Sequence, residues 1–202
     1  MKVNNMYIVE NFLRREDHQK IEEFIYSDDF EWKYVAFKSI PRDDNIQSGH
    51  EYHNQQMCRT IYNSVTGVRD MKYLPHFMPV GVLLSPFAAL RMKINFQFPC
   101  AEVVQSPFHH DIVIEQIPND VKVYTAILYL NTNNGHTIFE DTGEKIESKR
   151  NRLVVFDARR AHAGTSFTNA RNRIVININF IPSIETEKFL ERNNVYCKEG
   201  NQ

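Results

Sequence analysis

The chain has 202 residues, a length typical of one domain that buries about 70% of its unfolded surface and needs no disulfide or structural metal to fold. Its 24 Lys and Arg residues nearly balance 25 Asp and Glu residues, so charge gives no sign of a nucleic-acid or membrane partner. Three widely spaced cysteines, no apolar leader and no apolar run of about 18 residues predict an unanchored cytoplasmic protein.

The first part of the chain predicts one strand and one helix, followed by an irregular segment. Residues 6–9 are β-prone, and residues 14–26 carry apolar side chains at i, i+3 and i+4, which indicates an amphipathic helix. Residues 30–62 show no clean periodicity. They include His50 and His53, which we interpret as solvated loop residues rather than as a metal pair.

Residues 71–90 are apolar and contain three prolines. We expect a buried helix with Pro79 in its first turn and an apolar face of Leu83, Leu84, Phe87 and Leu90. His76 is expected to be a packing residue. Together, residues 1–90 are predicted to form a helical and irregular support.

Alternating residues then predict a succession of short strands. In residues 91–98, Met92, Ile94, Phe96 and Phe98 share one face, whereas Arg91, Lys93, Asn95 and Gln97 share the other. Further strands are expected at residues 112–114, 121–130, 136–140, 145–147, 153–156 and 173–181, with the strongest turn signal at Asn134-Gly135.

Short strands behind an N-terminal helix favour a mainly β fold with flanking helices, a double-stranded β-helix of the jelly-roll type. We predict one domain over residues 1–202. Its jelly-roll core covers residues 91–181, and residues 182–202 form a C-terminal extension with a short helix around 187–190.

A possible metal site begins at the tripeptide His109-His110-Asp111. On an extended segment residues i and i+2 project to the same side, so His109 and Asp111 can reach one ion while His110 points elsewhere; His110 is the alternative ligand. A third ligand is expected from His162, which follows the buried run 153–156. Two imidazoles and one carboxylate form the facial triad that holds non-haem Fe(II) and leaves coordination positions open.

An arginine opens the last predicted strand. The planar guanidinium of Arg173 can bind the far carboxylate of 2-oxoglutarate, a cosubstrate that chelates iron through its other end. Arg171 lies on the same face if the strand extends that far, so it is the alternative anchor. Asn95 is a further pocket candidate, since one face of its strand would meet the barrel cavity.

Several segments together resemble a known family: residues 91–95, 108–111, 125–131, 134–135 and 151–156, with His162 and Arg173. They are similar to the 2-oxoglutarate/Fe(II)-dependent dioxygenase superfamily, specifically its prolyl 4-hydroxylase-like branch and the small phage and microbial members of that branch.

The resemblance implies His109, Asp111 and His162 as catalytic iron ligands and Arg173 as the partner of the 2-oxoglutarate C5 carboxylate. It also implies that Tyr129 and Thr125 line the cosubstrate pocket. The implied activity is that of a hydroxylase that consumes O2 and oxidatively decarboxylates 2-oxoglutarate to succinate and CO2.

The chain departs from the family pattern at two places. A single Gly135 is followed by His136, and Asn179 stands where the family often has an aromatic residue. The substrate therefore stays open among a peptidyl proline, another protein side chain, a free amino acid and a small metabolite. The oligomeric state is equally open. The alternatives are a cupin-like metalloprotein, acting as an isomerase or binding module without oxygenase activity, and a structural jelly roll with a lapsed site.

Overall fold

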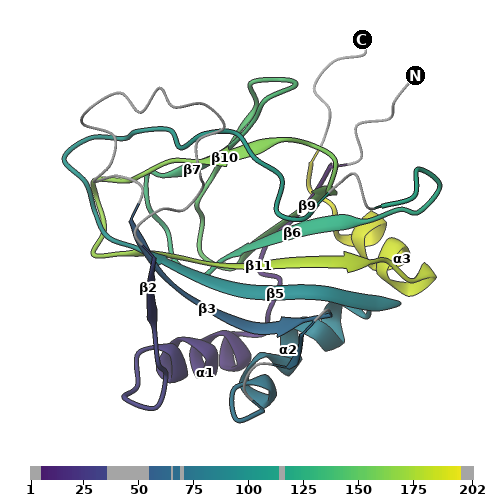
Figure 1. Cartoon of the computed structure of the whole chain (residues 1–202), viewed down its shortest axis with the longest axis horizontal. Coiled ribbons are helices and arrows are strands. Elements are labelled where there is room, and N and C mark those ends of the chain that lie inside the picture. The colour runs from purple at the N-terminus through teal and green to yellow at the C-terminus, as the bar shows by residue number, and fades with distance from the viewer. Residues whose placement is uncertain (1–5, 36–54, 65, 69–70, 114–116, 197–202) are drawn as a thin grey trace.

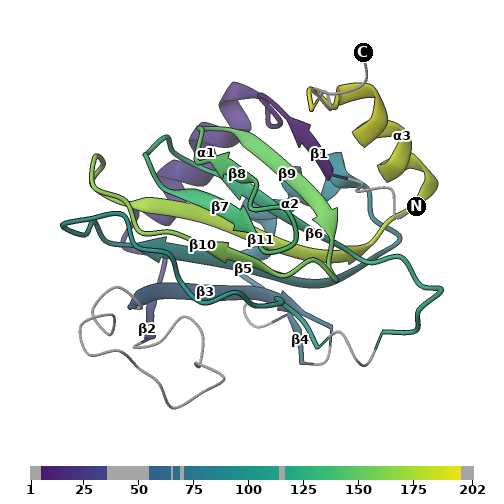
Figure 2. The same cartoon turned by 90° about the horizontal axis from the view of Figure 1, so that it is seen from above.

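The structure is a computed structural model that describes residues 6–35, 55–64, 66–68, 71–113 and 117–196. The strands of these residues form a larger sheet in the order β1-β9-β6-β11-β5-β3-β2, with β4 paired to β3, and a smaller sheet in the order β10-β7-β8. Figures 1 and 2 show the smaller sheet over one face of the larger sheet, whose other face carries α1 and α2. This arrangement confirms the predicted jelly roll.

The elements have the following bounds: β1 (Met6–Val9), α1 (Arg15–Ile25), β2 (Lys33–Val35), β3 (Gln56–Asn63), β4 (Gly67–Val68), α2 (Leu74–Leu84), β5 (Ala88–Gln97), β6 (Tyr124–Tyr129), β7 (His136–Phe139), β8 (Lys145–Glu147), β9 (Arg152–Asp157), β10 (His162–Gly164), β11 (Arg173–Ile181) and α3 (Ile184–Asn193). Within the described ranges, no helix is both long and apolar enough to cross a bilayer.

Strand alternation divides the interior into two cores. Ala126, Leu128 and Ile176 lie in the core beneath α1 and α2. Their neighbours in sequence, Ile127 and Val175, lie in the second core with β7 and β8. Because successive side chains of a strand point to opposite faces, the odd-numbered residues of β11 face the smaller sheet. This places Arg173 inside the barrel.

The larger sheet includes strands from the first 90 residues. β1 pairs with β9, and β3 pairs with both β5 and β2. The strand framework thus extends beyond the predicted core of residues 91–181. The apolar residues of β3 show no regular period of two in the sequence. The pairing of β3 with β5 is irregular between Thr60 and Tyr62, and its buried positions include the polar Gln56.

The predicted position of the second helix is wrong. α2 carries Pro75 in its first turn and Pro79 in its interior, and Ser85 adopts a left-handed conformation (φ 43°) at its end. β5 starts three residues later, so Leu90 is a strand residue and Phe87 is exposed. The sequence allows either Pro75 or Pro79 in the first turn of a helix, where the missing N–H group of proline breaks no hydrogen bond.

The remaining local predictions have mixed outcomes. Ile112 and Val113 form no strand. The ring of His76 stacks on that of Phe24, with the ring centroids 3.5 Å apart, although the residue itself is exposed. His50 and His53 lie outside the described residues.

Asn151 connects the turn before β9 to the segment before α1. Its side-chain oxygen accepts from the Leu13 amide (2.9 Å), its side-chain nitrogen donates to the Leu13 carbonyl (2.8 Å), and its φ is 60°. We expect Asn151→Ala to lower the free energy of unfolding by about 2–4 kcal/mol, because two hydrogen bonds are lost and alanine is strained in this conformation. Urea unfolding measures this loss.

Asn151→Gly is the matched control, since glycine adopts the left-handed conformation without strain. It should lose about 1 kcal/mol less than the alanine variant. Equal losses of unfolding free energy in the two variants would contradict the role of backbone strain. A wild-type free energy of unfolding in Asn151→Ala would show that the hydrogen bonds to Leu13 do not stabilise the fold.

Candidate active site

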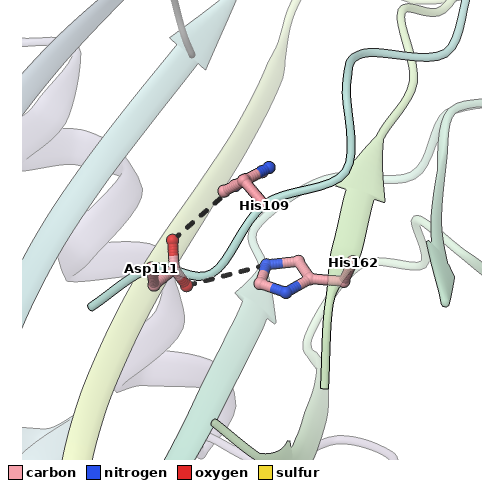
Figure 3. A group of neighbouring side chains, drawn as sticks. All are labelled: His109, Asp111 and His162. Carbon is pink, nitrogen blue, oxygen red and sulfur yellow. Dashed lines mark ion pairs between the residues drawn. The ribbon is translucent and has the colours of Figure 1, made fainter. Parts of the chain in front are cut away.

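A short backbone bridge positions the two candidate histidine ligands. The His109 amide donates to the His162 carbonyl and the His162 amide donates to the His109 carbonyl, both at 3.0 Å. Asp111, two residues after His109, turns its carboxylate towards both rings (Figure 3). Its Oδ1 lies 3.9 Å from His109 Nε2 and its Oδ2 lies 3.7 Å from His162 Nε2. One donor atom of each residue lies within 4.8 Å of the others, a spacing at which one cation can reach all three.

Backbone carbonyls orient both imidazole rings. His109 Nδ1 lies 3.2 Å from the Pro107 carbonyl oxygen, and His162 Nδ1 lies 3.4 Å from the Arg160 carbonyl oxygen. A carbonyl at Nδ1 fixes the proton there and leaves the lone pair on Nε2, the atom that faces Asp111. The residues therefore present two neutral nitrogen donors and one oxygen donor, the set that suits Fe(II).

The surroundings favour the charge states that a metal needs for Asp111 and His162. Burial acts to raise the pKa of Asp111, but its interactions with His162, Arg91, His109 and Lys93 outweigh burial and hold that pKa below its usual value. For His162, burial is the main cause that lowers the pKa of the ring, against the opposing effect of Asp111. An anionic carboxylate and a neutral imidazole are the forms that bind metal ions.

Arg173 is a buried cation that pairs with no carboxylate of the described residues. Its Nε donates to Ser148 Oγ (2.8 Å) and its Nη1 donates to Gln97 Oε1 (3.2 Å), while it makes no ion pair with any residue in the described part of the chain. Burial lowers its pKa, and the nearby Tyr129 raises it. An unpaired buried charge is costly, so this guanidinium is suited to an anionic ligand.

The triad and Arg173 line one cavity with a volume of about 190 Å³. Asn95 also lines it, as predicted. Arg171 is exposed in the turn before β11, so of the two arginines Arg173 is the one that reaches the cavity.

Thr125 and Tyr129 lie behind the cavity wall instead of lining it. The Tyr129 hydroxyl donates to Thr137 Oγ1 (2.7 Å), and Thr137 is the residue that faces the cavity. Thr125 Oγ1 accepts from Asn179 Nδ2 (2.9 Å). Side chains of β7 and β11 cover this face of β6. Thr125 and Tyr129 therefore contact these covering side chains and support the pocket from behind.

His110 lines the cavity but lies outside the triad, and its Nε2 is 3.2 Å from the Arg159 carbonyl oxygen. Two supports of Arg173, Ser148 and Gln97, were not predicted. Gln97 lies on the same strand face as Asn95, and this pattern could have identified Gln97 as a pocket residue. No sequence signal distinguished Ser148.

Gly135 is required by close packing against Arg173. A Cβ atom at this position would lie 3.1 Å from Arg173 Cδ and 2.9 Å from Asn133 Oδ1. We expect Gly135→Ala to displace the guanidinium and to raise the concentration of 2-oxoglutarate needed for half-saturation roughly 10- to 100-fold, because misplacements of about 1 Å can have such effects. Titration with 2-oxoglutarate measures this change.

Gly81→Ala in α2 is the control, since a Cβ atom there meets nothing within 4 Å. It should leave 2-oxoglutarate binding unchanged. Unchanged binding in Gly135→Ala would show that Arg173 tolerates the added methyl group.

A jelly roll with a His-Asp-His triad and a buried arginine in one cavity defines a class, the metal-dependent oxygenases with a dicarboxylate cosubstrate. Residues 97–181 match a family model described as the 2OG-Fe(II) oxygenase superfamily. The matched residues include the triad and Arg173, and they indicate a 2-oxoglutarate-dependent oxygenase, as the motifs predicted. Its cofactors are Fe(II), 2-oxoglutarate and O2. No curated protein sequence matches the chain significantly.

Solved structures share the fold at low sequence identity. A prolyl hydroxylase from Trichoplax adhaerens, solved with a peptide fragment of a hypoxia inducible factor, is 17% identical (TM-score 0.56; 92% of this chain and 87% of that one). A 2OG-Fe(II) oxygenase family oxidoreductase from Burkholderia pseudomallei is 10% identical (TM-score 0.58; 89% and 88%). A Pseudomonas putida prolyl-4-hydroxylase is 15% identical (TM-score 0.53; 90% and 94%). The resemblance to prolyl hydroxylases is thus confirmed as a likeness of fold.

Proposed function

We propose that this protein hydroxylates its substrate while 2-oxoglutarate is converted to succinate and CO2. The observation that carries the proposal is Arg173, a buried cation without an ion-pair partner among the described residues, which faces the same cavity as the triad. Bound Fe(II) would supply the activation of O2. The chain supplies the ligands His109, Asp111 and His162 and the anchor for the far carboxylate of 2-oxoglutarate.

Neighbouring side chains keep these groups in place. Asn177 Nδ2 lies 3.4 Å from Asp111 Oδ2, and Arg91 Nη1 donates to the Asp111 main-chain oxygen (2.9 Å). Ser148 restricts the guanidinium of Arg173 through its Nε. These contacts support a site organised before its ligands bind, which lowers the entropic cost of binding.

The buried arginine also separates this proposal from the alternatives. A cupin-like isomerase or a binding module has no use for an unpaired cation beside its metal ligands, and a lapsed site would not retain a costly buried charge. The cytoplasmic location and the absence of a nucleic-acid or membrane partner are part of the proposal. A peptidyl proline is one candidate substrate, since two of the structures with this fold are prolyl hydroxylases.

Anaerobic titration with Fe(II) and then 2-oxoglutarate tests the proposal. A weak visible charge-transfer band should develop only when both are present, because it arises from direct chelation of the metal by the cosubstrate. A folded, metal-loaded protein without this band would contradict the proposal.

A further inference from the structure

The cavity face of β5 carries two cations at the end away from the 2-oxoglutarate anchor. Gln97 contacts Arg173 near one end of the strand, whereas Arg91 contacts Asp111 near the other. Lys93 is the residue next to Arg91 on this face, and both line the cavity. Residues two apart on a strand are separated by about 6.6 Å, so the two cations are neighbours.

These cations exceed the negative charge that the loaded site would hold. The charges of Fe(II) and Arg173 are balanced by those of Asp111 and the two carboxylates of 2-oxoglutarate. Arg91 and Lys93 remain. Arg91 lies 3.8 Å from the Asp111 carboxylate, a group required by the metal, and Lys93 makes no ion pair with any described residue. Burial is the main cause that lowers the pKa of Lys93, against the opposing effects of Cys58 and Asp111.

Two amide oxygens beside Lys93 accept no hydrogen bond from the described residues. They are Asn95 Oδ1 and Asn177 Oδ1, and both are buried. Asn177 is the cross-strand neighbour of Lys93, and its Nδ2 is directed towards Asp111, so its oxygen faces another direction. Buried acceptors are almost always satisfied, and here an N–H group of a ligand would satisfy them.

We propose that the substrate is a free amino acid, whose carboxylate binds Lys93 and Arg91 and whose ammonium group donates to Asn95 and Asn177. This inference rests on the proposed function and narrows its substrate class. An uncharged peptidyl proline would leave both cations and both oxygens unmatched. The adjacent positive and negative groups of an amino acid match the adjacent acceptors and cations of the cavity wall.

The test measures, by saturation-transfer NMR, which probe molecules bind anaerobically to protein loaded with Fe(II) and 2-oxoglutarate. The probes are the twenty free amino acids, the same residues capped as N-acetyl amides, and phosphoserine as a phosphate-bearing probe. At least one free amino acid should bind, and its capped form should not. Exposure of that complex to O2 should add one oxygen atom to the bound amino acid, detected by mass spectrometry.

Lys93→Met should weaken binding of the amino acid about 10- to 100-fold, the effect of losing a charged hydrogen-bond partner. Lys145→Met removes an exposed lysine of β8 and should have no effect. The charge-transfer band must persist in both variants, which shows that the fold and the 2-oxoglutarate site are intact. Asn95→Leu, a second variant, should also weaken binding.

The outcomes separate the two proposals. Loss of the charge-transfer band in the wild-type protein overturns the proposed function. With a normal band, four results overturn this inference alone. They are no binding of any free amino acid, tighter binding of the capped residues, and binding of phosphoserine in preference to every unphosphorylated amino acid. The fourth is wild-type affinity in Lys93→Met.

Discussion

Replacing His109 with alanine is expected to weaken Fe(II) binding at least about 100-fold, because removal of even an outer-shell partner of a metal ligand typically costs 10- to 100-fold. His109 Nε2 faces the Asp111 carboxylate, and its other ring nitrogen is held by the Pro107 carbonyl. Anaerobic titration with Fe(II), followed by measurement of bound iron after gel filtration, gives the affinity. Asp111→Ala should lose as much, since it removes the charged ligand.

His110→Ala is the matched control for His109→Ala. It removes the same side chain one position later, where the imidazole faces the Arg159 carbonyl instead of Asp111. We expect this variant to keep its iron affinity within about threefold, since it loses no ligand atom. If His110→Ala loses iron and His109→Ala retains it, the assignment of the first ligand is wrong.

Strand periodicity allowed much of this site to be predicted. The bounds expected for the last strand, residues 173–181, are those of β11, because its polar residues, Arg173, Asn177 and Asn179, all fall on one face of a strand. The same rule placed His109 and Asp111 on one side of their segment although that segment pairs with its neighbours only by isolated bridges. Where the period of two is regular, it fixes which side chains meet.

Other features depend on tertiary contacts that no local pattern encodes. Ser148 reaches Arg173 from the position directly after β8, 25 residues earlier, and Thr137 places its side chain between Tyr129 and the cavity. The start of α2 was misplaced because two prolines four residues apart satisfy the same local rule. Burial and partners become known only when distant segments lie side by side, so the supports of a site are harder to predict than its ligands.

Replacing Arg173 with leucine is expected to raise the 2-oxoglutarate concentration needed for half-saturation roughly 30-fold to several thousand-fold. Loss of one member of a buried, hydrogen-bonded charge pair costs about 2–5 kcal/mol, and each 1.4 kcal/mol corresponds to a factor of about ten. Iron affinity should not change, since Arg173 contacts Ser148 and Gln97 and none of the triad. Titration of the charge-transfer band with 2-oxoglutarate measures both properties in one sample.

Two further variants separate charge from geometry in this prediction. Arg171→Leu removes an equal charge from an exposed position two residues earlier and should leave the titration unchanged. Arg173→Lys keeps the charge but loses the planar fork that makes two parallel bonds to a carboxylate, so its affinity should fall between those of the wild type and Arg173→Leu. If Arg171→Leu weakens 2-oxoglutarate binding as much as Arg173→Leu does, the effect comes from the overall charge of the region, and the buried guanidinium is not the anchor.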